Sequence, residues 1–302
     1  MKITNRYGAP QTLVNLMRRD PYSRGASHIS VTQLIDAPRV RVLREKHDHE
    51  IEADVSDSLW ALVGRALHHV VERGAMDDHV AEQRLFADVG GWRLSGAIDL
   101  QQIGGDRVVI GDYKFTSAWA ATNDKPEWER QLNVYSWLAR QAKQLETERL
   151  EVYALIRDWN RRDAKIKSGY PRAPILTVPI KLWTADEQDA YVRDRIRRHQ
   201  EAWAAHEWGE QLPLCNEEER WVRRSQWAVE SPGRARAVRV FDTEEAAIAF
   251  VANGDTDGDD QTVRTLSVVH RAGQPVRCLS FCPCAKFCTQ HQAYLKTIGK
   301  AE

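Results

Sequence analysis

The spacing of apolar residues alternates between helical and strand-like periods along the first two thirds of the chain. Residues 57–74 carry Leu, Val and Ala at helical spacing, and Gly74 follows as a stop signal. From 82 to 115 the period shortens to two, with glycine-rich turns between the segments. Helices interleaved with strands in this way predict an α/β fold. The expected strands are 82–89, 92–103, 107–115, 150–159 and 174–182, and the expected helices are 57–74, 126–144 and 184–208.

The two ends of the chain add smaller elements. Residues 30–47 are expected to be helical, with Ser30 or Thr32 as the N-cap and an interruption at Pro38. After residue 213 the pattern predicts short strands, a capped helix that ends at Gly254, and an exposed polar loop. We therefore expect three parts. They are a domain over 1–210, a small α/β subdomain over 211–277, and a cysteine-rich tail over 278–302.

Composition and charge narrow the classes of function. The formal net charge is zero, so no overall field draws the chain to nucleic acid, and any such binding must come from local basic patches. No apolar run approaches the length of a membrane span, and the first residues lack the apolar segment of a secretory signal. We therefore expect a cytoplasmic protein with no membrane partner, in which thiols stay reduced and clustered cysteines bind metal.

One pair of expected strands places two carboxylates together. Asp112 and Lys114 are two residues apart, so both point to one face of a strand. If Gly105 and Asp106 form a two-residue turn, paired residues have numbers that sum to 211, and Asp99 lies opposite Asp112. Their Cβ atoms would then be about 5 Å apart. Such carboxylates repel unless a cation such as Mg²⁺ or Mn²⁺ binds between them. A solvent-facing strand that carries Asp and Lys remains the alternative from spacing alone.

Further motifs, in the right order, make the first two thirds of the chain similar to the RecB-like exonuclease branch of the PD-(D/E)XK nuclease superfamily. The resemblance implies a restriction-endonuclease-like core, in which helices flank a mixed central sheet. The matching positions are Gly64 and His68 of a Gly-x-x-x-His helix, Glu82 at the first strand, Asp99, Asp112 and Lys114 of the nuclease signature, and Gln131 and Tyr135 of a Gln-x-x-x-Tyr helix.

The resemblance also implies roles for these residues in phosphodiester hydrolysis. His68, Asp99, Asp112 and the main-chain carbonyl of Tyr113 would bind the catalytic metal, and Lys114 would orient or activate the attacking water. A neutral imidazole ligand suits Mn²⁺ better than Mg²⁺.

The remaining motif residues have supporting roles in this interpretation. Glu82 counts among the expected catalytic acids, while Gln131 and Tyr135 would support the lysine or contact the DNA backbone. Gly64 shares a helix face with His68, and its small size is expected to let another backbone approach that histidine.

A basic loop provides a further candidate for DNA binding. Residues 157–172 are expected to form a loop that binds phosphates, with Trp159 or Tyr170 stacking on bases. A solvated loop without such a role is an equally good interpretation of the same residues.

The five cysteines suggest a second metal centre. Cys215 stands alone, and the other four crowd into residues 278–288. Thiolates select zinc or iron–sulfur clusters. One distant cysteine with three near the C-terminus is similar to the CRISPR-associated iron–sulfur exonucleases, which implies a 4Fe-4S cluster on Cys215, Cys278, Cys282 and Cys288, with Cys284 left over. The pattern departs from that family because the lone cysteine follows the nuclease motifs. Zinc, or a local site of the four tail cysteines, stays open.

Together these features predict a Mg²⁺- or Mn²⁺-dependent DNA exonuclease with a structural iron–sulfur cluster. The resemblance is to phage-encoded members that serve DNA recombination, repair or replication. The expected partners are DNA, single-stranded or with accessible ends, and a recombination protein. The alternative is a non-catalytic DNA-binding recombination accessory that retains the nuclease fold.

Overall fold

The computed structural model describes residues 1–19, 25–74, 76–253 and 266–299. The chain divides into two compact units, Met1–Pro213 and Leu214–Glu302, which we call the first and second units. Among the helices within the described ranges, none combines the length and the apolar character that a bilayer crossing requires.

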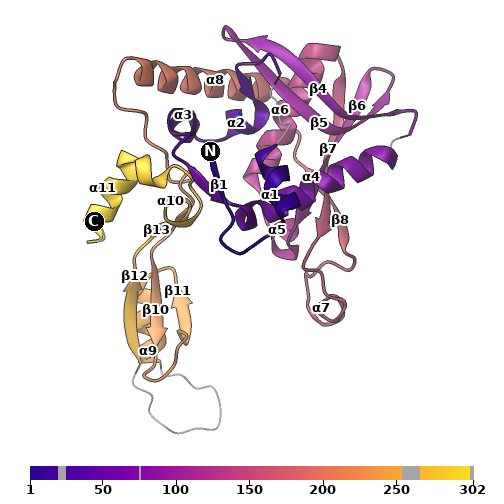
Figure 1. The fold of residues 1–302 in the computed structure, drawn as a ribbon. Helices are drawn as coiled ribbons and strands as arrows, with labels where there is room; N and C mark the ends of the chain where they lie inside the picture. Colours follow the sequence, from indigo (N-terminus) through magenta and orange to yellow (C-terminus); the bar gives the residue numbers. More distant parts are fainter. Residues whose placement is uncertain (20–24, 75, 254–265, 300–302) are drawn as a thin grey trace. The chain divides into compact units, whose positions relative to one another are not determined.

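A mixed sheet forms the centre of the first unit (Figure 1). Its strands run in the order β2-β5-β6-β7-β8, and β4 pairs with β5 outside this path. The pairs β4–β5, β5–β6 and β7–β8 are antiparallel, whereas β2–β5 and β6–β7 are parallel. The predicted mixed sheet is thereby confirmed. The strands are β2 (Ile29–Ser30), β4 (His79–Val89), β5 (Trp92–Gly104), β6 (Arg107–Thr116), β7 (Glu146–Ile156) and β8 (Ile175–Ile180).

Helix α6 (Pro126–Lys143) makes the crossover between the parallel strands β6 and β7. Parallel neighbours need such a connection, and the helix covers the sheet with a long buried face. Leu132 and Leu138 are fully buried there, together with Ile98 and Ile110 of the sheet. Helix α8 (Ala185–Glu207) packs against α6 and begins at a capping box formed by Thr184 and Glu187.

The segment 30–47 contains two helices, as the interruption at Pro38 predicted. These are α2 (Val31–Ile35), with a capping box at Ser30, and α3 (Pro38–Lys46), which begins with the proline at its first position. The expected loop 157–172 is wrong in part, because it contains the short helix α7 (Arg161–Ile166), capped by the Asn160 side chain. The other elements of the first unit are β1 (Lys2–Thr4), α1 (Gln11–Arg18), β3 (Glu52–Asp54), η1 (Val55–Ser58), α4 (Leu59–Val71), η2 (Glu72–Gly74) and α5 (Ala118–Thr122).

The second unit holds a three-stranded antiparallel sheet with β10 at its centre, and helix α9 packs on it. Short strands and a capped helix after residue 213 are found as predicted, whereas β12 was not predicted. Gly254 and nearly all of the expected polar loop lie outside the described residues. The elements are β9 (Val222–Arg223), β10 (Gln226–Glu230), β11 (Arg239–Phe241), α9 (Glu244–Ala252), β12 (Ser267–Arg271), β13 (Gln274–Pro275), α10 (Val276–Ser280), η3 (Ala285–Phe287) and α11 (Thr289–Thr297).

Candidate active site

The β5–β6 hairpin has the register that the sequence predicted. Its pairs run from Gly104 with Arg107 to Leu100 with Gly111, so paired numbers sum to 211 and residues 105 and 106 form the turn. The ladder stops one pair before Asp99 and Asp112. At that point Oδ2 of Asp99 accepts the main-chain N–H of Tyr113 at 2.9 Å. A side-chain carboxylate therefore takes a strand N–H at the place where the two strands leave their ladder.

The neighbouring β4–β5 ladder also breaks at Asp99. The pairs on either side place Glu82 opposite Asp99, yet this pair is missing from the ladder. Glu82 has a φ of 51°, in the left-handed region that non-glycine residues seldom occupy. Holding a glutamate there costs roughly 1–3 kcal/mol. Breaks in both ladders at one residue free the side chains of Glu82 and Asp99 for a common site.

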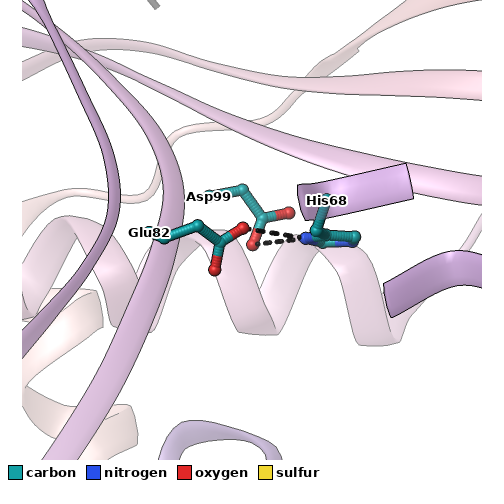
Figure 2. A group of neighbouring side chains, drawn as sticks. All are labelled: His68, Glu82 and Asp99. Carbon is teal, nitrogen blue, oxygen red and sulfur yellow. Dashed lines mark hydrogen bonds and ion pairs between the residues drawn. The ribbon is translucent and has the colours of Figure 1, made fainter. Parts of the chain in front are cut away.

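His68 of α4 completes a group of three potential metal ligands (Figure 2). Its Nδ1 lies 3.1 Å from Oε1 of Glu82 and 3.4 Å from Oδ1 of Asp99. One ligand atom from each residue lies within 4.8 Å of the other two, and over the described ranges no second group of three His, Cys, Asp or Glu residues does so. Hydrogen bonds to Asp99 and Glu82 raise the pKa of His68 to about 10. The imidazole is thus held as a cation between two carboxylates.

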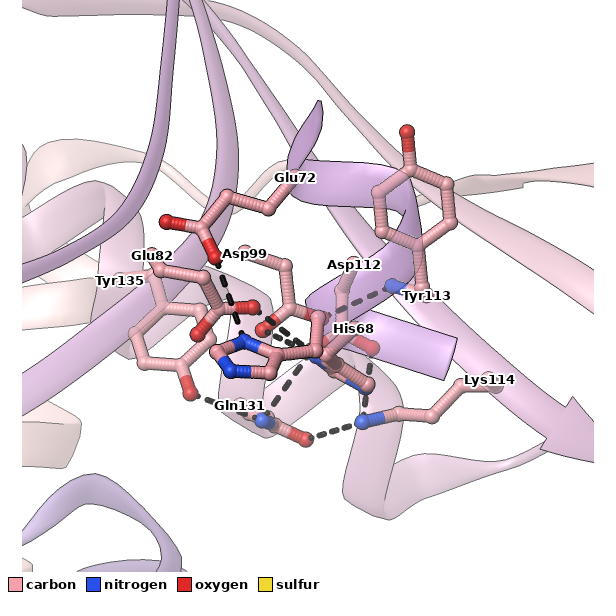
Figure 3. Close-up of polar contacts among 10 residues, drawn as sticks. His68, Glu72, Glu82, Asp99, Asp112, Tyr113, Lys114, Gln131 and Tyr135 are labelled. Atoms are coloured by element: carbon pink, nitrogen blue, oxygen red, sulfur yellow. Dashed lines mark hydrogen bonds and ion pairs between the residues drawn. The ribbon is translucent and has the colours of Figure 1, made fainter. Parts of the chain in front are cut away.

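A second set of polar contacts adjoins this group (Figure 3). Nζ of Lys114 lies 2.7 Å from Oδ2 of Asp112 and donates to Oε1 of Gln131 at 3.1 Å. Gln131 in turn donates through Nε2 to Oδ1 of Asp112 at 3.2 Å and to the Tyr135 hydroxyl at 2.9 Å. The Asp112 side chain is 1% exposed. Lys114, Asp112 and Gln131 therefore form a closed triangle of contacts, which Tyr135 supports from α6.

The pKa values in this triangle follow from burial and charge. Burial raises the pKa of Asp112 to about 6, and the nearby Asp99 carboxylate acts in the same direction, against the opposing effect of Lys114. Burial alone would lower the pKa of Lys114, but the Asp112 carboxylate outweighs it and raises the pKa above its usual value. At neutral pH the lysine is a fixed cation.

Comparison with known proteins then identifies the fold family. A profile of the PD-(D/E)XK nuclease superfamily matches residues 30–288. The chain belongs to this superfamily. No curated protein sequence matches the chain.

Two solved structures resemble part of it. SSO0001 has 16% identity and a TM-score of 0.42 over 62% of this chain and 82% of its own. An alkaline exonuclease from Laribacter hongkongensis has 13% identity and a TM-score of 0.30, over 49% and 67% of the two chains.

PD-(D/E)XK nucleases use divalent metals, and the residues expected to bind one are distributed over both sets of contacts. His68 and Asp99 lie together with Glu82, whereas Asp112 contacts Lys114, and the metal-binding role of Asp112 stays a prediction. The sequence placed Glu82 on the right strand and carried no signal for its unusual backbone. The Tyr113 ring lies edge-on to His68, and the metal-binding role of its carbonyl stays a prediction.

The explanation offered for Gly64 is wrong. A Cβ atom built at this residue meets no atom within 4 Å in the described structure, so no backbone uses the space beside it to approach His68. Two strand glycines that the motifs did not include do need their small size. A Cβ at Gly96 would lie 2.8 Å from the Tyr135 ring, and one at Gly111 would lie 2.5 Å from the Tyr153 ring. An isolated glycine inside a strand pattern is the signal that could have found them.

Trp159 and Tyr170 are half-buried, and their proposed stacking on bases stays a prediction. Both pack against the hydrophobic core. The indole N–H of Trp159 donates to the carbonyl of Pro171 at 2.9 Å. The Tyr170 hydroxyl accepts the N–H of Asn160 at 3.0 Å and donates to the carbonyl of Asp158 at 3.1 Å. The two aromatic residues therefore hold the 157–172 segment in place.

The five cysteines all lie in the described part of the second unit, and none forms a disulfide. Gln290 of α11 ties down the main chain at Cys215, accepting its N–H at 2.9 Å and donating to its carbonyl at 2.8 Å. Burial raises the pKa of the Cys278 thiol, and the thiols of Cys282 and Cys288 act in the same direction from nearby. Cys215 is thus fastened to the helix that directly follows Cys288.

Proposed function

We propose that this member of the PD-(D/E)XK superfamily is a metal-dependent DNA exonuclease of the RecB-like branch, which hydrolyses phosphodiester bonds at DNA ends. The observation that carries the proposal is the convergence of His68, Glu82 and Asp99 beside the Asp112–Lys114 pair. A role in DNA recombination, repair or replication, with a protein partner, extends this proposal.

The donor set fits a divalent cation of the Mg²⁺ or Mn²⁺ type. Carboxylate oxygens suit both ions, and a histidine nitrogen shifts the preference toward Mn²⁺. His68, Glu82 and Asp99 would hold the ion, because one ligand atom of each lies within 4.8 Å of the others. When bound, the cation would lower the pKa of a water and offset the charge that develops on the phosphate.

The protein's own residues have distinct tasks in this mechanism. Lys114 keeps its proton at neutral pH, so it acts as a fixed donor that orients a water or a phosphate oxygen rather than as a base. Asp112 and Gln131 hold its ammonium in place, and Tyr135 holds Gln131. With its left-handed backbone, Glu82 places a carboxylate oxygen 3.1 Å from Nδ1 of His68.

End-labelled single-stranded and duplex DNA, incubated with the purified protein and Mg²⁺ or Mn²⁺, provide the test. We expect release of labelled products from linear DNA and none from closed circles. Asp112→Asn and Lys114→Met should each lower the rate at least 100-fold while circular dichroism stays unchanged. His69→Gln is the matched control, because its side chain lies outside both sets of contacts and is 84% exposed. A folded wild-type protein that binds DNA and cuts none would instead identify the non-catalytic accessory.

We further propose that Cys215, Cys278, Cys282 and Cys288 ligate one 4Fe-4S cluster. Two observations support it: the tie between Cys215 and α11, and the proximity of the Cys278, Cys282 and Cys288 thiols. Zinc on the same thiolates is the alternative, because thiolates bind either zinc or an iron–sulfur cluster.

Colour and metal content test the cluster. Anaerobically purified protein should be brown, with broad absorbance near about 400 nm and about four irons per chain. Serine at position 215, 278, 282 or 288 should remove the colour, whereas Cys284→Ser should keep it. Stoichiometric zinc in a colourless protein would refute the cluster. A brown Cys215→Ser beside a colourless Cys284→Ser would place the site wholly within the tail.

A further inference from the structure

Two exposed tryptophans stand near the end of β6 that carries Lys114. Trp60 of α4 is 54% exposed, and Trp119 of α5 is 65% exposed. A cation lies over each ring. The guanidinium carbon of Arg157 is 5.0 Å from the Trp60 ring centroid, and Nζ of Lys125 is 4.7 Å from that of Trp119. Each indole is thus exposed to solvent and has a cation over its ring.

The contacts at the end of β6 bring the Trp60 pair close to the active site. The Trp60 ring centroid is 6.3 Å from that of Phe115, the residue next to Lys114. The N–H of Arg157 donates to the carbonyl of Thr116 at 2.8 Å. Along α4, Trp60 precedes His68 by eight residues, about 12 Å at the usual rise. Trp60 and Arg157 are therefore within a few nucleotides of the proposed reaction centre.

Trp119 belongs to the same edge of the sheet. Helix α5 begins at Ala118, two residues after β6 ends, and Oδ1 of Asp158 accepts the Ala118 N–H at 2.7 Å. Asp158 directly follows Arg157, so the two tryptophans are linked through the neighbouring ends of β6 and β7. Figure 1 shows α4 and α5 at this edge of the first unit.

We propose that Trp60 and Trp119 form a stacking platform for unpaired bases. The substrate of the active site is then single-stranded DNA, and this inference rests on the function proposed above. The bases of a duplex stack on one another, so their faces are not available to a protein. Exposed indoles therefore bind an unpaired strand in preference to a duplex. The cation over each ring contributes only weakly at an exposed site. A base can therefore take its place, and the released cation can bind the adjoining phosphate.

The charge near the platform suits a DNA strand. Beyond Arg157 the chain enters α7, where the Arg161, Arg162 and Lys165 side chains are exposed. Asp163 of the same helix pairs with Lys167 at 3.0 Å, so its carboxylate is already engaged by a lysine. A chain with no net charge overall thus places one basic side chain over each of these tryptophans, and further exposed basic side chains follow Arg157 along the sequence.

Binding measured without cleavage tests the platform. The full chain is titrated in EDTA into labelled oligothymidylate and into a duplex of the same length. Trp60→Ala and Trp119→Ala should each weaken single-strand binding roughly 5- to 100-fold, with little change for the duplex. Trp60→Phe should restore most of the affinity. Trp208→Ala is the control, because Trp208 is also exposed, at 74%, and ends α8 in the same unit.

The outcomes separate this inference from the proposed function. Unchanged single-strand binding in both alanine variants overturns the platform, even if the wild type cleaves DNA in Mn²⁺. An equal loss on single strands and duplexes overturns it as well, since it would indicate a general phosphate contact. Failure of the wild type to cleave any DNA defeats the proposed exonuclease but leaves the binding comparison intact.

Discussion

Binding of Mn²⁺ at His68, Glu82 and Asp99 should release a proton. The two carboxylates hold the pKa of His68 at about 10, so the imidazole is protonated at pH 7. A histidine must be neutral to bind a metal ion. At pH 7 the group lies about three units below its pKa, and at about 1.4 kcal/mol per unit the proton opposes metal binding by about 4 kcal/mol.

Isothermal titration calorimetry can measure this proton directly. Titrations with Mn²⁺ in two buffers of different ionisation enthalpy should show about one proton released per ion. Between pH 7 and 8.5 the apparent affinity should rise roughly tenfold per pH unit, because a larger fraction of His68 is then neutral. Asp112 adds little to this slope, since its pKa of about 6 leaves it ionised throughout that range.

His68→Gln tests the assignment, because glutamine keeps a hydrogen-bonding side chain that does not titrate. Its Mn²⁺ affinity should be lower at pH 8.5 and nearly independent of pH. The exposed neighbour His69, changed to glutamine, should leave both the slope and the released proton as in the wild type. No proton release from the wild type, or the same slope in His68→Gln, would refute the reasoning.

Three other expectations concern stability. Because the pKa of His68 is raised, its protonated form stabilises the folded protein, fully so below pH 6.5. This stabilisation is lost as the pH rises toward 10, so the urea midpoint in EDTA should fall over that range, and should fall less in His68→Gln. Gly96→Ala should cost roughly 1–3 kcal/mol in urea unfolding, because its methyl group meets the Tyr135 ring, whereas Gly104→Ala on the same strand meets nothing within 4 Å and should be nearly neutral. Thr184→Ala should lower the unfolding free energy by about 1 kcal/mol through loss of the α8 cap, and an unchanged midpoint would contradict that assignment.

Local rules account for the parts of the fold that the sequence predicted. A two-residue turn fixes the register of both strands that it joins, so Gly105 and Asp106 were enough to align β5 with β6. Helix α8 was predicted within one residue at each end, and the structure shows a local capping box of Thr184 and Glu187 at its start. Each of these predictions depends only on neighbours in the sequence.

The parts that escaped prediction depend on the packed structure. The six residues of α7 are too short to show a helical period. Exposure of a tryptophan is set by distant elements, so the sequence singled out Trp159, which is half-buried against the core, and carried no signal for the exposed Trp60. The left-handed backbone of Glu82 lies where two ladders break at Asp99, and no local signal in "AEQRL" predicts it.

The backbone at Glu82 has a consequence for engineering this protein. Glycine adopts a positive φ freely, and asparagine does so more readily than glutamate. Variants with glycine or asparagine at position 82 should therefore be enriched in a library selected for thermal tolerance alone. These variants should cleave DNA poorly, because they lack the Glu82 carboxylate. Selection for heat resistance and selection for catalysis would therefore favour different residues at position 82.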